Sequence, residues 1–197
     1  MKTIDSIQRV VDEEMIEVMC RLEAANNTKL ALLLQDIGKD ELALIGELIQ
    51  MYCMSDALCR GLTAMLREKR LGSPSDFAFL LNDADVLLHT KKEAKQTDLN
   101  IDTAGIISAV ETIEMHRIFR HTFSHWVVKS YIDERFLVAF TRSKSDAEKR
   151  DGATLDDGKA KLMVFRIDDL LTELKKVKGH CRFLSELHLY LENSTTT

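Results

Sequence analysis

The first part of the chain places apolar residues at the three- and four-residue intervals of amphipathic helices. The pattern runs through residues 5–24, stops at a short polar stretch, and resumes over residues 29–34. It then continues from about Leu42 to about Leu71. Gly38 fits the end of one helix and Asp40 fits the N-cap of the next. This part of the chain is therefore predicted to be helical.

A fourth helical segment is predicted after Gly72-Ser73-Pro74, because proline is favoured in the first turn of a helix. The buried stripe of this segment is expected at Phe77, Leu80, Leu81 and Leu88. The polar stretch 91–100 then predicts a linking loop. Asp102 can cap a central helix, which we expect to run from about Thr103 to about Tyr131.

The apolar period changes from helical to strand-like after the central helix. Residues 135–141 and 161–167 are rich in β-branched and aromatic side chains, which predicts the two strands of a hairpin. The connection at 144–159 holds nine charged residues in sixteen and two glycines, so we expect a solvated loop. Asp168 fits the cap of a final helix over residues 168–191.

These elements predict a mainly α fold in a single domain of 197 residues. The helical core is expected at about 5–131, the β-hairpin at about 134–167 and the C-terminal helix at about 168–191. One proline and eight glycines leave few places for a domain boundary. Because no apolar run approaches a membrane span and the N-terminus lacks the apolar core of a secretion signal, we expect a soluble, cytoplasmic protein with no membrane partner.

Four cysteines are present without any CxxC spacing, namely Cys20, Cys53, Cys59 and Cys181. They stand among apolar residues, as free thiols do in the core of a protein from a reducing compartment. We therefore expect them to be packing residues.

Charge is unevenly distributed along the chain, whose net charge is -5. Residues 1–60 carry six Lys or Arg and eleven Asp or Glu, which gives 6 − 11 = −5, whereas residues 115–150 carry eight and four, which gives 8 − 4 = +4. The overall acidity argues against a protein that coats nucleic acid nonspecifically. The positive stretch nevertheless contains the most distinctive group of polar side chains.

Basic and imidazole side chains gather near the end of the central helix, in the segment Arg120-His121-Thr122-Phe123-Ser124-His125-Trp126. At 100° per residue, the apolar line through Ile106 and Ile113 continues into Arg117, Arg120, His121 and Ser124. Arg120 and His125 are five residues apart, so they lie about 140° apart around an ideal helix. A second copy of this helix, related by a two-fold axis, could bring two copies of each side chain around one cleft.

Such a cleft suits the cleavage of RNA without a metal or another cofactor. A neutral imidazole can remove the proton of a ribose 2′-hydroxyl, an imidazolium can protonate the leaving oxygen, and a guanidinium can stabilise the charge that grows on phosphorus. The first product would be a 2′,3′-cyclic phosphate.

The segment Arg120–Trp126 resembles the RxxxxH motif of the HEPN (higher eukaryotes and prokaryotes nucleotide-binding) superfamily. The resemblance covers about residues 1–131 and implies a HEPN-like α-helical bundle that acts as a homodimer. It also implies a metal-independent endoribonuclease, often a toxin or a phage-defence effector, and in some cases a nucleotidyltransferase-like antitoxin as partner. Arg120, His121 and His125 match the motif arginine, its neighbouring polar position and its histidine. The β-hairpin is absent from the minimal family pattern, and the neighbouring position is His where Asn is frequent.

Further side chains are candidates for contact with the RNA. Arg117 and Ser124 lie on the same helix face as the motif, and Lys129 follows it. Lys129, Arg135, Arg142 and Lys144 could steer phosphate toward the cleft or could form an ordinary solvated surface. Phe123 and Trp126 could stack on bases, but their place on the far side of the helix favours the core.

Two alternatives remain open. His121 and His125 have the i, i+4 spacing of two metal ligands, with Glu114 on the adjacent line, although Arg117 and Arg120 would repel a divalent cation. The chain could also be a non-catalytic helical module that binds a nucleotide, RNA or a protein partner, which the overall acidity and the histidine at position 121 mildly favour.

Overall fold

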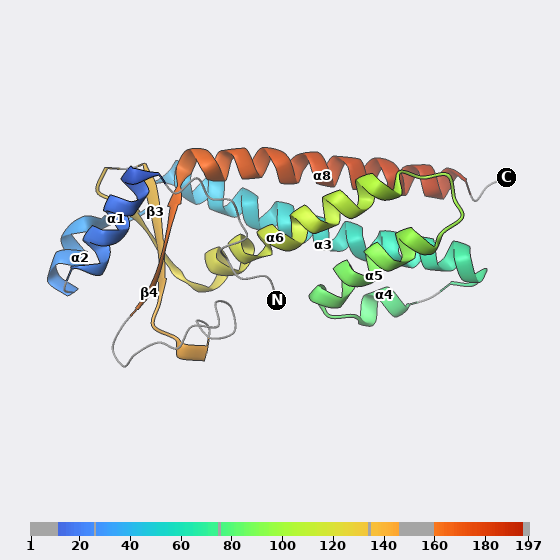
Figure 1. Ribbon diagram of the computed structural model, residues 1–197, viewed down its shortest axis with the longest axis horizontal. Coiled ribbons are helices and arrows are strands. Elements are labelled where there is room, and N and C mark those ends of the chain that lie inside the picture. The colour runs from blue at the N-terminus through green and yellow to red at the C-terminus, as the bar shows by residue number, and fades with distance from the viewer. Residues whose placement is uncertain (1–11, 26, 75, 134, 146–159, 195–197) are drawn as a thin grey trace. The chain divides into compact units, whose positions relative to one another are not determined.

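A computed structural model describes residues 12–25, 27–74, 76–133, 135–145 and 160–194. The described part is mainly helical, with seven helices and one four-stranded antiparallel sheet (Figure 1). The mainly α character predicted from the sequence is thus confirmed. Residues 5–11, most of the predicted 144–159 connection and residues 195–197 lie outside the described residues.

The helices are α1 Glu13–Glu23, α2 Asn27–Leu33, α3 Lys39–Leu71, α4 Phe77–Leu80, α5 Asp83–Gln96, α6 Thr103–His125 and α8 Ile167–Asn193. The strands are β1 Leu34–Gln35, β2 Val127–Tyr131, β3 Phe136–Thr141 and β4 Lys161–Arg166. Figure 1 labels these helices, together with β3 and β4.

The chain divides into two compact units. The sheet unit comprises residues 1–47 and 118–173, and the helical unit comprises residues 48–117 and 174–197. The chain passes from one to the other within α3, α6 and α8. That it forms a single domain stays a prediction.

The sheet unit is organised by the two faces of its sheet. The strands follow the order β1-β2-β3-β4, and all neighbours are antiparallel. The hairpin predicted between residues 135–141 and 161–167 is confirmed, because β3 pairs with β4 in the register Leu137 opposite Phe165. Successive side chains of a strand point to opposite faces. The sheet therefore presents two separate sets of side chains to the helices that cover it.

One set, which we call the first face, packs against α1 and α2. Tyr131, Phe136, Val138 and Val164 form one buried cluster with Met15, Val18 and Leu22 of α1. Leu30 and Leu33 of α2 pack against this cluster, with Leu34 and Leu162. In Figure 1 these two helices lie beside the strands. The other set, the second face, includes Met163 and Phe165, which contact the end of α6.

The central helix ends earlier than predicted. Asp102 caps its start as expected, because the carboxylate accepts a hydrogen bond from the Gly105 amide at 2.8 Å. The helix stops at His125, however, and residues 127–131 form β2 instead of the last turns. The prediction of a helix to Tyr131 is therefore wrong. Val127 and Val128 suit a strand, and β3 supplies a pairing partner that the local pattern does not reveal.

The helical unit has its own core, formed by residues of α3, α5, α6 and α8. Its buried members are Cys59, Leu62, Leu66, Val86, Leu87, Ala94, Ile106, Val110, Ile113, Leu184, Leu187 and Leu191. The apolar stripe of α6 that includes Ile106 and Ile113 is therefore covered by the same chain. Its burial therefore does not require a partner subunit.

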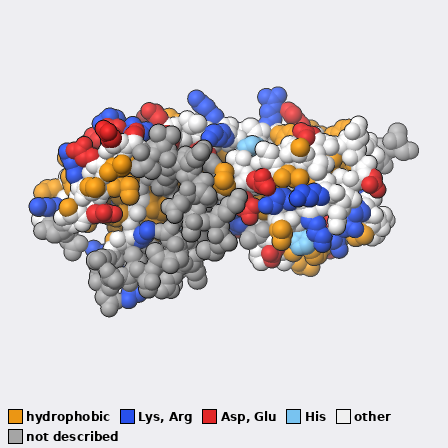
Figure 2. All heavy atoms as spheres, in the orientation of Figure 1, with side chains coloured by type: hydrophobic (Ala, Val, Ile, Leu, Met, Phe, Trp, Pro, Cys, Tyr) orange, Lys and Arg blue, Asp and Glu red, His pale blue; other side chains and the backbone are white. Residues whose placement is uncertain are grey.

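Two predictions about the region after Pro74 are wrong. Leu80 is 84% exposed and Leu88 is 59% exposed, so they are not part of a buried stripe. Figure 2 shows hydrophobic side chains among Lys and Arg on the surface of the helical unit. The predicted loop at 91–100 is helical as far as Gln96. The reason is the burial of Glu93 and Ala94, each 1% exposed, on the inner side of α5.

The cysteines divide into two kinds, so the expectation that all four are packing residues holds only in part. Cys59 and Cys181 are buried, whereas Cys20 and Cys53 are exposed. Burial raises the pKa of the Cys59 thiol to about 12 and that of Cys181 to about 11. The two buried thiols are therefore protonated near neutral pH and unsuited to nucleophilic attack.

Among the described residues, α3 is long enough and contains an 18-residue window apolar enough to cross a membrane, by length and composition alone. This corrects the statement that no apolar run approaches a span. About two fifths of the window (39%) is buried inside the protein, and core helices of soluble proteins have the same properties. Solubility and a cytoplasmic location stay predictions.

Glu93 joins α3 to α5 through two arginines. Arg70 donates to its two carboxylate oxygens at 2.8 and 3.0 Å, and Arg67 donates at 3.3 Å. Burial alone would raise the pKa of Glu93, but the hydrogen bonds and charge of Arg70, followed by those of Arg67, outweigh it and lower the pKa. The carboxylate is thus held ionised in the interior.

Replacement of this carboxylate by an amide is expected to destabilise the protein. Glu93→Gln leaves two guanidinium groups without their counter-charge, so we expect the free energy of unfolding at pH 7 to fall by about 1–3 kcal/mol. Because the folded pKa is lowered, the stabilisation is present above the unfolded pKa of about 4.3 and is lost as pH falls through the folded pKa. The measurement is urea unfolding of both proteins across that pH range.

The matched control is Glu114→Gln. Glu114 pairs with Lys91 at 2.7 Å but is 54% exposed, so its loss should cost less than about 0.5 kcal/mol. Equal effects of the two substitutions, or an effect of Glu93→Gln that grows in acid, would contradict this account.

Candidate functional site

The predicted motif occupies the last two turns of α6, in the sheet unit. Phe119, Thr122, Phe123 and Trp126 are buried, whereas Ser124 and His125 are exposed and Arg120 and His121 are half-buried. The buried positions follow the three- and four-residue spacing of one helix face. The polar residues of the motif therefore occupy the rest of the helix surface, because the apolar face packs against the sheet.

The anchor is the second face of the sheet. The ring of Phe165 contacts both Phe119 and Phe123, with centroid distances of 5.7 and 5.0 Å. The hydroxyl of Thr122 donates to the Met163 sulfur at 3.7 Å. Phe123 and Trp126 are each 7% exposed, so our preference for a core position over base stacking is confirmed. These contacts hold the end of α6 against β4, the second strand of the hairpin.

The structure brings two of the predicted catalytic side chains into contact. The rings of His121 and His125 have centroids 4.3 Å apart and planes 36° apart. One helical turn separates the two residues, which puts both imidazoles on the same side of the helix. His125 is exposed and can exchange protons with solvent, while Nε2 of His121 is buried and has no hydrogen-bond partner among the described residues. This pair has the composition needed for proton transfer near neutral pH.

Arg120 precedes His121 on the same turn and is half-buried. Its place on the helix is about 140° from that of His125 for ideal geometry. Within one chain the two positions therefore lie on different sides of the helix. The expectation that a second helix is needed, if both groups are to act on one phosphate, stays a prediction.

Arg117 is engaged in an ion pair of the helical unit. Its guanidinium lies 3.4 Å from the carboxylate of Asp83, which also accepts a hydrogen bond from Arg60 at 2.6 Å. Arg60 in turn donates to the carbonyl oxygens of Ala78 and Leu81. These contacts connect α3 and α6 to the start of α5. They give Arg117 a structural role that its sequence position did not reveal.

Lys129 lies apart from the histidines. It is opposite Val138 in the sheet, so its side chain belongs to the first face, whereas the end of α6 covers the second. There it forms an ion pair with Asp36, and the hydrogen bond and charge of Lys129 lower the pKa of that carboxylate. The structure therefore does not place Lys129 beside the predicted catalytic residues.

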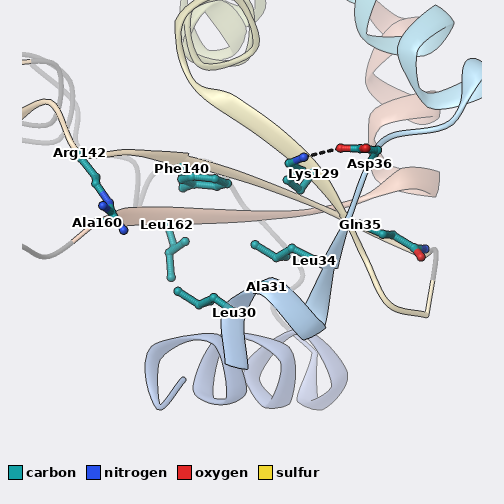
Figure 3. Close-up of a pocket in the computed structure, with 10 residues that line it drawn as sticks. All are labelled: Leu30, Ala31, Leu34, Gln35, Asp36, Lys129, Phe140, Arg142, Ala160 and Leu162. Atoms are coloured by element: carbon teal, nitrogen blue, oxygen red, sulfur yellow. Dashed lines mark hydrogen bonds and ion pairs between the residues drawn. The ribbon is translucent and has the colours of Figure 1, made fainter. Parts of the chain in front are cut away.

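Lys129 instead lines a groove that the sequence pattern did not indicate (Figure 3). Its other lining residues come from α2, β1 and Asp36 on one side and, distant from these in sequence, from the hairpin on the other. The only local sign was the two-residue alternation of the strands, which divides their side chains between two faces without showing what covers each.

The structure offers no third ligand for the alternative in which His121 and His125 bind a metal ion, as far as the described residues go. Within the described ranges, no group of three His, Cys, Asp or Glu side chains is arranged to hold a metal ion. Glu114, the residue considered as a partner of the two histidines, forms an ion pair with Lys91.

The burial of Trp126 can be tested by fluorescence, because it is the only tryptophan of the chain. We expect the native protein to emit at shorter wavelength than the urea-unfolded protein and to be several-fold less quenched by acrylamide, since the indole is 7% exposed. Single-stranded RNA should leave the emission unchanged. Strong acrylamide quenching in the native state, or quenching by RNA in the manner of a stacked base, would contradict the core position.

In comparisons with known proteins, no family model, no curated protein and no solved structure matches this chain. The basis for assigning a function is accordingly the chemistry of its own side chains.

Proposed function

We propose that this protein is a metal-independent endoribonuclease of the HEPN RxxxxH type. The observation that carries the proposal is the contact of His121 with His125 at an exposed helix end, with Arg120 on the same turn. Two imidazoles and a guanidinium are sufficient for RNA cleavage through the 2′-hydroxyl. In this proposal His125 transfers protons, Arg120 stabilises the charge on phosphorus and His121 orients His125.

The reaction needs no outside reactant in its first step. A neutral imidazole takes the proton of the 2′-hydroxyl, and the oxygen attacks the adjacent phosphorus. The bond from phosphorus to the 5′-oxygen breaks, and an imidazolium protonates that oxygen as it leaves. The products are a 2′,3′-cyclic phosphate and a free 5′-hydroxyl.

A homodimer is part of the proposal because Arg120 and His125 diverge around one helix. A two-fold axis near the end of α6 would place Arg120 of one subunit with His125 of the other. The exposed side chains available for such a contact include Ser124, His125 and Val127, the last 52% exposed. A cytoplasmic toxin or phage-defence role, with a nucleotidyltransferase-like antitoxin, is the biological setting that the HEPN resemblance suggests.

The second candidate function is a non-catalytic module that binds RNA, a nucleotide or a protein. It is favoured by the contacts of Arg117 with Asp83 and of Lys129 with Asp36, which use two predicted substrate-binding groups within the fold. In that case Arg120, His121 and His125 would be a binding surface and no RNA would be cleaved.

Substitution of the proposed catalytic residues tests the first candidate. His125→Ala and Arg120→Ala should each lower the cleavage rate of a labelled single-stranded RNA by at least about a hundredfold, the usual scale for loss of a proton-transfer or charge-stabilising group. EDTA should leave wild-type cleavage intact, and the products should carry 2′,3′-cyclic phosphates. The pH profile should be bell-shaped if one imidazole must be neutral and another charged.

Matched controls are His180→Ala and Arg182→Ala, which remove the same side-chain types from α8. Both should cleave like the wild type, and circular dichroism should show that all four variants are folded. Cleavage that persists in both site variants excludes the proposed roles. Loss of activity in EDTA with recovery in zinc favours the metal alternative, and the absence of cleavage by the wild type favours the binding module.

Mixing two inactive variants tests the shared cleft. If each cleft joins Arg120 of one subunit to His125 of the other, re-associated Arg120→Ala and His125→Ala subunits should recover roughly a quarter of wild-type activity, since half of random pairs are mixed and each mixed pair keeps one intact cleft. Light scattering should report a dimer. No recovery in a proven mixed dimer would mean that each active site lies within one subunit.

A further inference from the structure

The groove beside Lys129, on the first face of the sheet, is separate from the histidine pair. Its volume is about 500 Å³, within the range of roughly 300–1,000 Å³ that is usual for small-molecule sites. Its lining consists of Leu30, Ala31, Leu34, Gln35, Asp36, Lys129, Phe140, Arg142, Ala160 and Leu162. Figure 3 shows the aliphatic side chains of α2 and β1 on one side and Phe140 on the other. The groove is thus large enough for a small ligand and is lined mainly by apolar residues.

The inner walls of the groove are apolar. Leu30, Leu34 and Leu162 are half-buried and pack against the core cluster of the sheet unit, and Phe140 is half-buried on the same face. The uncharged polar side chain of the lining, Gln35, is exposed. The inner walls therefore offer apolar contact, and the polar groups of the lining side chains are at the rim.

The charged side chains of the lining are already engaged. Lys129 forms an ion pair with Asp36, and its hydrogen bond and charge hold the pKa of that carboxyl below its usual value. Arg142, toward the other end of the groove in Figure 3, has an interaction of its own. A charged ligand would have to displace one of these contacts or remain unpaired between apolar walls, and either is costly. The compensated charges therefore favour a neutral ligand.

We propose that this groove binds a neutral single-chain lipid with a hydroxyl head group, of the fatty-alcohol type. Its hydrocarbon chain would lie between Phe140 and the leucines, and its hydroxyl would lie at the rim beside the Lys129–Asp36 pair. A hydroxyl can accept a hydrogen bond from the ammonium and donate one to the carboxylate without separating the two. An aliphatic chain fits better than a nucleobase, because the polar edges of a base would find no polar side chain on the inner walls. The proposal does not depend on ribonuclease activity.

Calorimetric titration with decanol below its solubility limit tests the proposal. We expect saturable one-to-one binding by the wild type. Decanoate and protonated decylamine have the same hydrocarbon chain with a negative or a positive head, and each should bind at least about tenfold more weakly, because neither finds an uncompensated counter-charge. The proposal is overturned if decanol does not bind, or if either charged analogue binds as tightly as decanol.

The role of the ion pair is tested by changing the charge preference of the groove. Asp36→Asn removes the counter-charge of Lys129, so decanoate should bind at least about threefold more tightly than it does to the wild type, with little change for decanol. The matched control is Glu17→Gln, which removes an exposed carboxylate paired with Arg21 outside the lining and should change neither affinity. An unchanged affinity of Asp36→Asn for decanoate would overturn the placement of the head group beside Lys129.

A second pair of variants tests where the ligand binds. Ala31→Trp should abolish decanol binding, because Ala31 is an exposed residue of the lining and the indole would fill the groove without removing a core side chain. Thr28→Trp adds the same ring to an exposed position of α2 outside the lining and should bind like the wild type. Circular dichroism should show that both variants are folded. Equal decanol binding by the two variants, or binding of AMP in place of decanol by the wild type, would overturn the proposal.

Discussion

The alternation of side chains along β2, β3 and β4 is the constraint on which the sheet unit depends. Each strand contributes to two apolar surfaces at once, so Val138 and Val164 meet α1 while Met163 and Phe165 meet the end of α6. A slip of one residue in register would exchange the two sets. The pairing between the strands therefore fixes the position of the motif on one face and of the groove on the other.

The packing of the end of α6 against β4 determines which motif side chains are left at the surface. Its inward positions at the helix end are taken by Phe119, Thr122 and Phe123, which contact β4. The polar residues are left on the outer circumference, where a one-turn separation brings His121 to His125. On an ideal helix Arg120 lies about 140° from His125, which is why the proposed reaction uses a second subunit.

Several charged residues form ion pairs that connect helices of the fold. Glu93 is shared by two arginines, and Asp83 is likewise shared by Arg60 and Arg117. Both arginines of Glu93 come from α3, whereas those of Asp83 come from α3 and α6. In each case one carboxylate of α5 holds two cationic side chains, which offsets the cost of removing charge from water. Charge clusters in a sequence therefore do not by themselves distinguish a binding surface from a connection between helices.

The sequence by itself determined what depends on local periodicity and local capping: the mainly α character, the start of α6 at its Asp102 cap, the β3–β4 hairpin, the core positions of Phe123 and Trp126, and the helical setting of the motif. Only the tertiary structure decided where α6 ends, that residues 127–131 form a strand, and that Lys129 faces away from the histidines. It also decided that Leu80 and Leu88 are exposed while Glu93 is buried. These outcomes depend on pairing and burial by segments distant in sequence, and a local pattern carries no information about such partners.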